Sequence, residues 1–329
     1  TELADAQGLC VVPGCIDLHV HGGGGADFLE ATPEAFRTVA EAHAQYGTTA
    51  LYATLAVFSP DTFRRAVRAC GQVQRHPGNG AAVLGLHLEG NYLNPAMKGG
   101  QPPEYISNPD PAEYEAMLDA APCIKRWSAA SELPGAYDFA RCAVSRGVLV
   151  ALAHTTADYG EVKAACAAGF THATHFYNAM TGVHREGEYK REGTVEGIYL
   201  TDEMTVEVIA DGIHVPPALL RMAYKFKGAE RVALVTDSMA AGAMPEGGKP
   251  FDPRVIVEDG VCKLADRSAL AGSIATADRL IRTMVREAGV PLEDAVRMAS
   301  ETPARIMGIS DRKGTLEAGK DADVILFDD

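Results

Sequence analysis

The amino-acid sequence predicts a (β/α)8 barrel of the TIM type. Short apolar segments of β-type composition alternate with longer helical segments, and eight of them fall within roughly 250 residues, the length that this fold usually occupies. Their apolar residues are continuous, as is typical of parallel strands buried on both faces. A doubly wound open sheet is the alternative fold, but it would normally use fewer strands. The predicted strands are 14–20, 48–57, 82–89, 124–131, 148–154, 172–177, 205–210 and 232–236.

Helical segments lie between most of the predicted strands. Proline stands near the start of four of them, at Pro33, Pro60, Pro111 and Pro217. A missing backbone N–H costs little in the first turn of a helix, so these prolines predict helix starts. The predicted helices are 33–46, 60–74, 111–120, 135–146, 160–168 and 217–225, followed after the eighth strand by 275–287 and 292–300.

The two chain ends and a late hairpin are predicted to lie outside the barrel. Asp259-Gly260 separates two β-type runs near 250–266, which is a hairpin signal. Residues 322–327 read as a final strand, which can share a small β layer with 10–12. We therefore predict a barrel over 14–312 and a small β-sandwich portion over 1–13 and 313–329, incomplete or differently built because few residues precede Cys10.

Composition and charge exclude several classes of protein. The formal net charge of -14 disfavours nucleic-acid binding, which usually needs a basic surface. The sequence has neither a run of about 18 apolar residues nor a leader-like start, so we expect no membrane span and no secretion signal. Seven cysteines without a CxxC pair indicate reduced thiols and predict a cytoplasmic protein.

Residues capable of metal binding or acid–base chemistry stand where the predicted strands end. In a (β/α)8 barrel these carboxyl ends meet at one rim, where catalytic residues lie. Imidazole and carboxylate groups together suit Zn²⁺ or another borderline divalent metal. A single histidine is more often an ordinary core or surface residue, but the coincidence of six strand ends favours a shared site. The residues are His19 and His21 after the first strand, Glu89 after the third, His154 after the fifth, His175 after the sixth, Asp211 and His214 after the seventh, and Asp237 after the eighth.

The spacing of the histidines separates predicted ligands from other roles. His19 and His21 are two residues apart, so both should lie on one face of a strand. His172 is three residues before His175 and should therefore point the other way. We predict ordinary core or surface positions for four histidines that do not share this placement, His43, His76, His172 and His184.

Asp237, in the stretch "LVTDSMAAG", is the predicted general base. A carboxylate that ends a buried strand beside a metal can take a proton from water. The alternative is that Asp237 only caps the turn that follows. The run 22–25 is all glycine but lacks the Lys-Ser/Thr of a P-loop, so we predict that it brings backbone close to the site.

Several stretches of the sequence together resemble a known family. They are "PGCIDLHVHGGGGADF", "GLHLEGNYLNP", "ALAHTTADYGEVKAACAAGFTHATHFYNAM", "IADGIHV", "LVTDSMAAG" and "KGTLEAGKDADVILFD". They resemble the amidohydrolase superfamily and, more closely, its N-acetylglucosamine-6-phosphate deacetylase family. The resemblance covers essentially the whole chain, and residues 154–180 are its most specific part.

The resemblance implies an amidohydrolase-type barrel and a metal-dependent deacetylase of amino-sugar catabolism. Such an enzyme converts N-acetylglucosamine 6-phosphate to glucosamine 6-phosphate and acetate, and is expected to be a homodimer. By position, Glu89, His154 and His175 would bind one divalent metal, and His19 and His21 would complete a second site. Zn²⁺ is the first expectation, and Fe, Co or Mn are alternatives.

The resemblance also assigns contacts to the substrate phosphate. His214, Asn178 and Ala179 fall on positions that contact it. An arginine shortly after the "NAM" motif often reaches the phosphate too, in some members from the neighbouring subunit. The spacing in "TGVHREGEYKREG" differs from the usual one, so Arg185 and Arg191 are both candidates.

Asp237 and Gln101 take the positions that would act on the reacting amide. Asp237 falls on the catalytic acid/base of the family. The family usually has Lys-Gly-x-His-Asn-Pro after the glutamate ligand, and that histidine donates to the substrate carbonyl, whereas this chain has "KGGQPP". A glutamine amide can donate a hydrogen bond, but it cannot shuttle a proton. We predict that Gln101 orients or polarises the acyl oxygen less strongly and marks a shifted substrate. A plain loop glutamine is the alternative.

Three other functions remain as alternatives. The same chemistry could act on N-acetylgalactosamine 6-phosphate or on an unphosphorylated N-acyl amino sugar, because Gln101 and the arginine spacing depart from the family. A ring-opening amidohydrolase would usually need a lysine at the end of the fourth strand, and Lys125 stands near its start. A non-catalytic barrel homologue tends to lose ligands, and this chain keeps the whole set.

Overall fold

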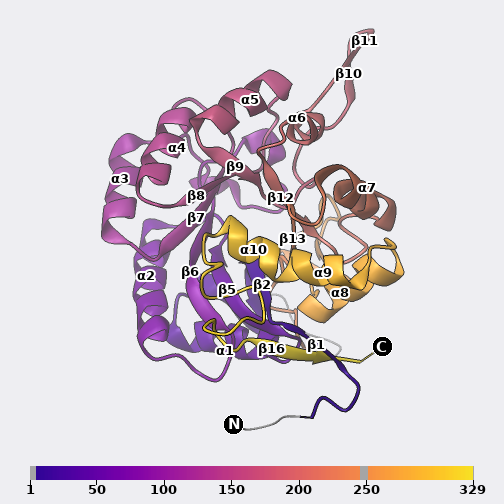
Figure 1. The fold of residues 1–329 in the computed structure, drawn as a ribbon. Helices are drawn as coiled ribbons and strands as arrows, with labels where there is room; N and C mark the ends of the chain where they lie inside the picture. The colour runs from indigo at the N-terminus through magenta and orange to yellow at the C-terminus, as the bar shows by residue number, and fades with distance from the viewer. Residues whose placement is uncertain (1–4, 245–250, 329) are drawn as a thin grey trace.

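Eight parallel strands form one sheet that curves into a barrel, and helices form a layer around it (Figure 1). The computed structural model describes residues 5–244 and 251–328. The predicted (β/α)8 fold is confirmed, because neighbouring strands follow the order β13-β12-β9-β8-β7-β6-β5-β2. The strands are β2 (Cys15–Val20), β5 (Thr48–Leu55), β6 (Ala82–Glu89), β7 (Ile124–Ala129), β8 (Leu149–Leu152), β9 (Phe170–Ala173), β12 (Thr205–Ile209) and β13 (Val232–Val235).

The edge strands β2 and β13 meet through the residues at and just beyond their ends. The backbone N–H of Asp237 donates to His19 O at 2.9 Å, and the N–H of His21 donates to Ser238 O at 2.9 Å. These bonds join the first and last strand ends. They also place His19, His21 and Asp237 side by side, although the strands that carry them are the most distant in the sheet order.

The helices begin where proline and short polar residues predict them to begin. Thr32 and Ser59 accept hydrogen bonds from first-turn backbone N–H groups, just before Pro33 and Pro60. Such caps satisfy donors that no helical carbonyl can reach. The sequence did not predict α6 and α10. The helices are α1 (Pro33–Ala44), α2 (Pro60–Arg75), α3 (Pro111–Ala120), α4 (Ala136–Ser145), α5 (Tyr159–Ala168), α6 (Thr194–Leu200), α7 (Pro217–Lys227), α8 (Ala277–Arg286), α9 (Leu292–Ala299) and α10 (Glu301–Ile306).

The sixth barrel strand differs from its prediction. The sequence predicts 172–177, but β9 ends at Ala173 and pairs with β8 and β12. His175 and Tyr177 have φ angles of 29° and 79°, which lie on the left-handed side and cannot continue a strand. The strand therefore ends earlier, and His175 lies in the loop that follows it.

The chain ends pair with each other outside the barrel. β1 (Cys10–Pro13) and β16 (Val324–Phe327) form an antiparallel two-stranded sheet, close to the predicted 10–12 and 322–327. Residues 1–4, 245–250 and 329 of the predicted parts lie outside the described residues. The division into domains stays a prediction.

Three short hairpins complete the described strands. β14 (Val255–Glu258) and β15 (Val261–Leu264) form the predicted hairpin, with Asp259 and Gly260 at φ angles of 54° and 75°. Positive φ at both turn residues is what the type I′ turn, one of the two common two-residue hairpin turns, requires. The others are β3 (Gly22–Gly23) with β4 (Ala26–Asp27), and β10 (His184–Glu186) with β11 (Tyr189–Arg191), which projects away from the barrel (Figure 1).

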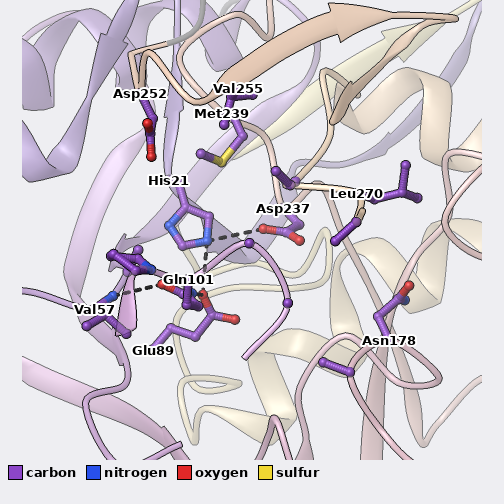
Figure 2. A pocket seen from close by; sticks show the side chains of 18 of the residues that line it. His21, Val57, Glu89, Gln101, Asn178, Asp237, Met239, Asp252, Val255 and Leu270 are labelled. Atoms are coloured by element: carbon purple, nitrogen blue, oxygen red, sulfur yellow. Dashed lines mark hydrogen bonds and ion pairs between the residues drawn. The ribbon is translucent and has the colours of Figure 1, made fainter. Parts of the chain in front are cut away.

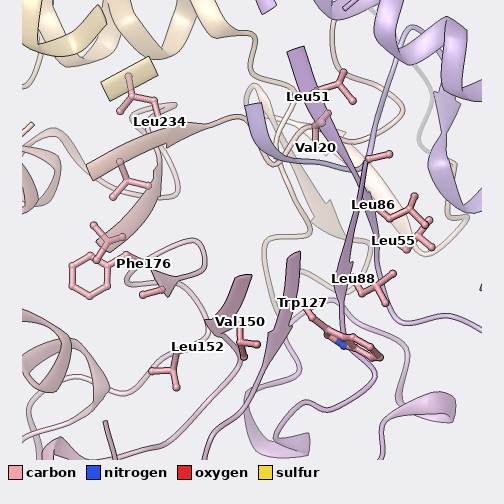
Figure 3. Close-up of a cluster of buried hydrophobic side chains, with 14 of the residues drawn as sticks. Val20, Leu51, Leu55, Leu86, Leu88, Trp127, Val150, Leu152, Phe176 and Leu234 are labelled. Atoms are coloured by element: carbon pink, nitrogen blue, oxygen red, sulfur yellow. The ribbon is translucent and has the colours of Figure 1, made fainter. Parts of the chain in front are cut away.

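Alternation along the strands separates two apolar clusters. On β5, Leu51, Ala53 and Leu55 belong to the large cluster that includes residues of the surrounding helices (Figure 3). Ala50 and Tyr52 belong to a smaller cluster that also includes residues of β2, β12, β13 and α10. Side chains in a strand point alternately to opposite faces, so the smaller cluster lies inside the barrel. It leaves the other end of the interior to polar residues.

Two further properties bear on the predicted class of protein. No helix among the described residues is both long and apolar enough to span a membrane. All seven cysteines lie in the described ranges and carry free thiols.

Candidate metal centre and active site

Two groups of ligand-type side chains converge at the rim, and Glu89 belongs to both. One group is His19, His21 and Glu89, and the other is Glu89, His154 and His175. Within each group the ligand atoms lie within 4.8 Å of one another, and all five residues are buried. Glu89 Oε1 lies 2.9 Å from His175 Nε2 and 3.2 Å from His154 Nε2. Glu89 Oε2 lies 3.3 Å from His21 Nε2.

The spacing of the imidazole nitrogens fits a metal site. The Nε2 atoms of His19 and His21 are 3.1 Å apart, as are those of His154 and His175. Tetrahedral Zn²⁺ with bonds of 2.0–2.1 Å separates neighbouring ligand atoms by about 3.3 Å. The five residues therefore suit one or two divalent metals in donor type, spacing and burial.

Three residues of the site hold a backbone conformation that is costly for them. His154, His175 and Asp237 have φ angles of 47°, 29° and 46°. Non-glycine residues in this region cost on the order of 1–3 kcal/mol each and persist where the surroundings hold them. The N–H of His175 donates to the Glu207 carboxylate at 3.1 Å, and that of Asp237 donates to His19 O. These bonds turn the side chains back towards the barrel mouth.

The carboxylates of the site favour positive charge beside them. Burial alone would lower the pKa of His19, but the carboxylates of Asp237 and Glu89 raise it well above its usual range. Burial likewise opposes protonation of His21, and its hydrogen bonds to the same two carboxylates raise its pKa to about 9. The pKa of Glu89 is held well below its usual range, against the effect of burial, by His19, His154 and His175. A divalent cation would compensate the negative charge of these carboxylates in place of the protons on the imidazole rings.

Other hydrogen bonds orient individual rings. His154 Nδ1 lies 2.7 Å from Met97 O, and His214 Nδ1 lies 2.8 Å from Asp211 Oδ2. A carbonyl or carboxylate oxygen can only accept, so each Nδ1 carries the proton and leaves Nε2 free towards the cavity. Asp211 is therefore the partner that orients His214.

Gln101 contacts the predicted ligand Glu89. Its Nε2 donates to Glu89 Oε2 at 2.8 Å, and its Oε1 accepts from the backbone N–H of Val57 at 3.0 Å (Figure 2). Gln101 is 9% exposed as a residue and lines the cavity, and its role towards a substrate stays a prediction. An amide nitrogen carries two N–H groups, so one remains for another acceptor.

A cavity of about 650 Å³ opens above the two groups. His21 and Asp237 line it, with Gln101 and Val57 to one side of Asp237 and Asn178 towards the opposite side (Figure 2). Glu89, Ala179, His154, His175 and His214 line it as well. The structure therefore brings all but two of the predicted metal, catalytic and substrate residues to one cavity or its floor, where His19 contacts His21 and Asp237.

The two exceptions are Arg185 and Arg191. They lie on the exposed β10–β11 hairpin, and Arg191 Nε donates to Glu186 at 2.7 Å. Neither is among the described residues that line the cavity. Among the described residues that line it, Arg254 supplies a guanidinium, which pairs with Asp252 at 2.5 Å. Sequence reasoning missed Arg254 because it precedes the hairpin and no strand end marks it.

The glycines at 22–25 approach the loop after β13 closely. A Cβ on Gly22 would lie 2.5 Å from Ala26 O and 2.6 Å from Ala240 N, which leaves no space for a side chain. The N–H of Gly22 donates to Ser238 O at 2.8 Å. The backbone of these glycines therefore packs closely against the loop after β13, and their approach to the site itself stays a prediction.

The expectation that His172 points away from the site is wrong. His175 leaves the strand, so alternation does not relate the two side chains. His172 Nε2 lies 3.2 Å from Glu207 Oε2, and Glu207 contacts His19 in turn. Sequence reasoning also missed Glu207 and its buried partner Arg126, although a charged residue within an apolar strand is a signal for each.

The amidohydrolase family model matches residues 10–329. The chain belongs to the amidohydrolase family. It is therefore a hydrolase, and the family is typically metal-dependent, in agreement with the ligand-type groups at the rim.

Relatives with similar sequences carry related activities in their names. The chain is 37% identical over 318 residues to the N-acetylglucosamine-6-phosphate deacetylase of Vibrio furnissii, which covers 96% of this chain and 78% of the relative. It is 36% identical over 327 residues to the N-acetylgalactosamine-6-phosphate deacetylase of Escherichia coli O157:H7, covering 98% and 84%.

Solved structures agree with the sequence relatives. The N-acetylglucosamine-6-phosphate deacetylase of Pasteurella multocida superposes with a TM-score of 0.91 at 30% identity, covering 98% of this chain and 84% of that one. A variant of the Mycobacterium smegmatis enzyme, in complex with N-acetyl-D-glucosamine-6-phosphate, superposes with a TM-score of 0.89 at 34% identity, covering 97% and 83%.

Proposed function

We propose that this chain hydrolyses the acetamide of N-acetylglucosamine 6-phosphate, giving glucosamine 6-phosphate and acetate. The observation that carries the proposal is the buried set of five ligand-type residues beside Asp237, which line one cavity or lie directly beneath it. The similarity to deacetylases along nearly the whole chain supports the same reaction. The free cysteines support a reducing cytoplasm as its location.

Five residues would hold the metal. Glu89, His154 and His175 would bind one divalent ion, and His19 and His21 would bind a second together with the shared Glu89. Zn²⁺ suits imidazole and carboxylate ligands, and Fe, Co or Mn are alternatives. When bound, the metal supplies Lewis-acid chemistry, which makes water a stronger nucleophile and polarises an amide carbonyl.

Asp237 would move the proton. Its Oδ1 lies 3.2 Å from His21 Nε2 and 3.4 Å from His19 Nε2, beside the cavity. The oxygen of water adds to the carbonyl carbon while Asp237 takes the proton of that water. Asp237 then passes this proton to the nitrogen as the C–N bond breaks, which releases the amine and acetate.

Gln101 would contact the acyl oxygen while it holds Glu89. One amide N–H already donates to Glu89, and the second is available on the cavity side. His214, Asn178 and Ala179 would contact the phosphate from another part of the same cavity. This arrangement separates the reacting amide from the phosphate, as the 2-acetamido and 6-phosphate positions of the sugar require.

A second candidate substrate is N-acetylgalactosamine 6-phosphate. The 36% identity to a deacetylase of that name supports it, because the identity to a deacetylase of the gluco sugar is 37%. Overall identity does not separate the two epimers, which differ only at one hydroxyl.

The experiment is amine release by metal-replete protein from both 6-phosphates and from unphosphorylated N-acetylglucosamine. We expect the gluco 6-phosphate to be preferred over the unphosphorylated sugar by about 100-fold or more in kcat/KM, because buried donors left without an acceptor penalise binding. That result would make Gln101 a tolerated replacement for the usual histidine. Preference for the galacto epimer would change the assigned substrate. If metal-loaded protein releases amine from none of the three sugars, the proposed function is overturned.

The exposed hairpin is proposed to serve a second chain in a homodimer. Val183 and Tyr189, in and beside β10–β11, are 59% and 63% exposed, which is unusual for large apolar side chains. A partner surface would cover them and bring Arg185 or Arg191 to a neighbouring cavity.

Replacing both hairpin arginines with alanine tests this role. We expect KM for the 6-phosphate substrate to rise by about 10-fold, because hydrogen bonds to charged groups are lost, while hydrolysis of the unphosphorylated sugar is unchanged. Arg64→Ala, on the exposed side of α2, is the matched control. The proposal would be contradicted if the wild-type protein sediments as a monomer in analytical ultracentrifugation, or if the KM of the double variant is unchanged.

A further inference from the structure

A buried ion pair lies inside the barrel beneath the predicted metal ligands. Arg126 of β7 and Glu207 of β12 are both 0% exposed, and Arg126 Nη1 lies 2.5 Å from Glu207 Oε2. Removing two charges from water is costly, and apolar residues in their place are often at least as stabilising. The presence of this pair therefore calls for a role beyond stability.

The other oxygen of Glu207 contacts both ligand groups. Glu207 Oε1 lies 2.8 Å from His19 Nδ1 and accepts the backbone N–H of His175 at 3.1 Å. His19 belongs to one group and His175 to the other. A single buried carboxylate oxygen thus connects the two halves of the site.

This contact determines which nitrogen of His19 faces the site. A carboxylate only accepts hydrogen bonds, so His19 carries its proton on Nδ1 and presents the lone pair of Nε2. Arg126 Nη1 contacts the other oxygen, Oε2, and this contact fixes the carboxylate with Oε1 towards His19. The ion pair therefore maintains an acceptor where His19 needs one.

We propose that Glu207 is a positioning residue for both metal groups. It orients His19, a ligand of the second metal, and it holds the backbone turn at His175, a ligand of the first metal. The inference rests on the proposed function, because it assumes that both groups bind metal. Glu207 is not among the described residues that line the cavity, so its effect would pass through these two ligands.

Glu207→Gln is the informative change because an amide has only one acceptor oxygen, whereas the donors of His19 and of Arg126 each need one. If its nitrogen faces Arg126, two donors oppose each other. If its nitrogen faces His19, that ring must accept at Nδ1 and carry its proton on Nε2, where it cannot bind a metal. In the first orientation the oxygen still accepts from His19, but the ion pair that fixes the side chain is lost and the opposed donors push the side chain out of place. In the second orientation the proton of His19 moves to the nitrogen that faces the site. Both orientations keep the side-chain volume.

The matched control is His172→Gln. His172 is also buried, and its Nε2 lies 3.2 Å from Oε2 of the same Glu207, the oxygen that Arg126 contacts. Removing it disturbs the same network but leaves Oε1 and its two contacts in place. A second variant, Glu207→Asp, keeps the charge beside Arg126 but is one methylene too short to reach both positions.

The experiment titrates Zn²⁺ and Co²⁺ into metal-free protein by calorimetry, with the Co²⁺ absorption spectrum as a report of coordination and a thermal melt as a report of folding. We expect wild type to bind two ions. Glu207→Gln and Glu207→Asp should bind the second ion about 10–100-fold more weakly with an altered Co²⁺ spectrum. His172→Gln should match wild type.

The outcomes separate the inference from the proposed function. Two ions in wild type with unchanged affinities in folded Glu207→Gln or Glu207→Asp would overturn the positioning role alone. One ion in wild type at saturation would overturn the coupling of two groups. No ion in wild type would overturn the proposed function, and equal weakening by His172→Gln would show that any disturbance of the network has the same effect.

Discussion

Replacing Asp237 with asparagine is expected to lower kcat by about 1,000-fold, within the range that general acid–base groups contribute. Asparagine keeps the shape of the side chain but cannot take the proton of the attacking water. The φ angle of 46° at this position is compatible with asparagine, which tolerates the left-handed region better than most residues. We therefore expect the fold to survive. Steady-state deacetylation and metal content by elemental analysis measure the two properties separately.

Asp252→Asn is the matched control for this change. Asp252 also lines the cavity, but it pairs with Arg254 rather than with any predicted ligand among the described residues. We expect its kcat to remain within a few-fold of wild type. Near-normal turnover by Asp237→Asn with normal metal content would rule out Asp237 as the proton carrier.

Replacing Glu89 with glutamine is expected to remove most of the bound metal from both groups. Glu89 is the shared member of the two groups, so one substitution weakens both. The amide has nearly the same volume but no charge, which lowers the attraction for a divalent cation and leaves four imidazoles without their common carboxylate. Activity should fall in parallel with metal content, and elemental analysis after dialysis measures the loss.

Glu132→Gln is the control for a carboxylate at the same rim. Glu132 accepts hydrogen bonds from Asn94, at 2.8 Å, and from the backbone N–H of Thr156, at 2.7 Å, and it lies outside both ligand groups. We expect it to retain its metal. Full metal content in Glu89→Gln would show that the histidines alone bind the ions, and the shared role of Glu89 would then be abandoned.

The barrel and most of its rim could be predicted from the sequence because both follow from local patterns. Continuous apolar runs indicate buried parallel strands, and the carboxyl ends of such strands meet by topology. Glu89 could therefore be placed at the rim without any knowledge of its neighbours. His154 and Asp237 follow the same reasoning, and the structure brings them to one cavity with Glu89.

The end of β9 shows where local patterns fail. The apolar and β-type residues continue to Tyr177, but the backbone turns at His175 because Glu207 accepts its N–H from a different strand. Gln101 is similar. Its side-chain chemistry identifies a donor, and only the fold of its loop decides that Glu89 is the acceptor.

The sequence by itself determined the fold class, the residue types at the strand ends and the family resemblance. The tertiary structure decided which of those residues touch, that the hairpin arginines lie away from their own cavity, and that Arg126 and Glu207 lie beneath the ligands. Strand propensity and the pattern of buried residues depend on residues that are neighbours along the chain, so they can be predicted from the sequence. The contact between His19 and Glu207 joins residues 188 positions apart, and its existence depends on the closure of the barrel between them.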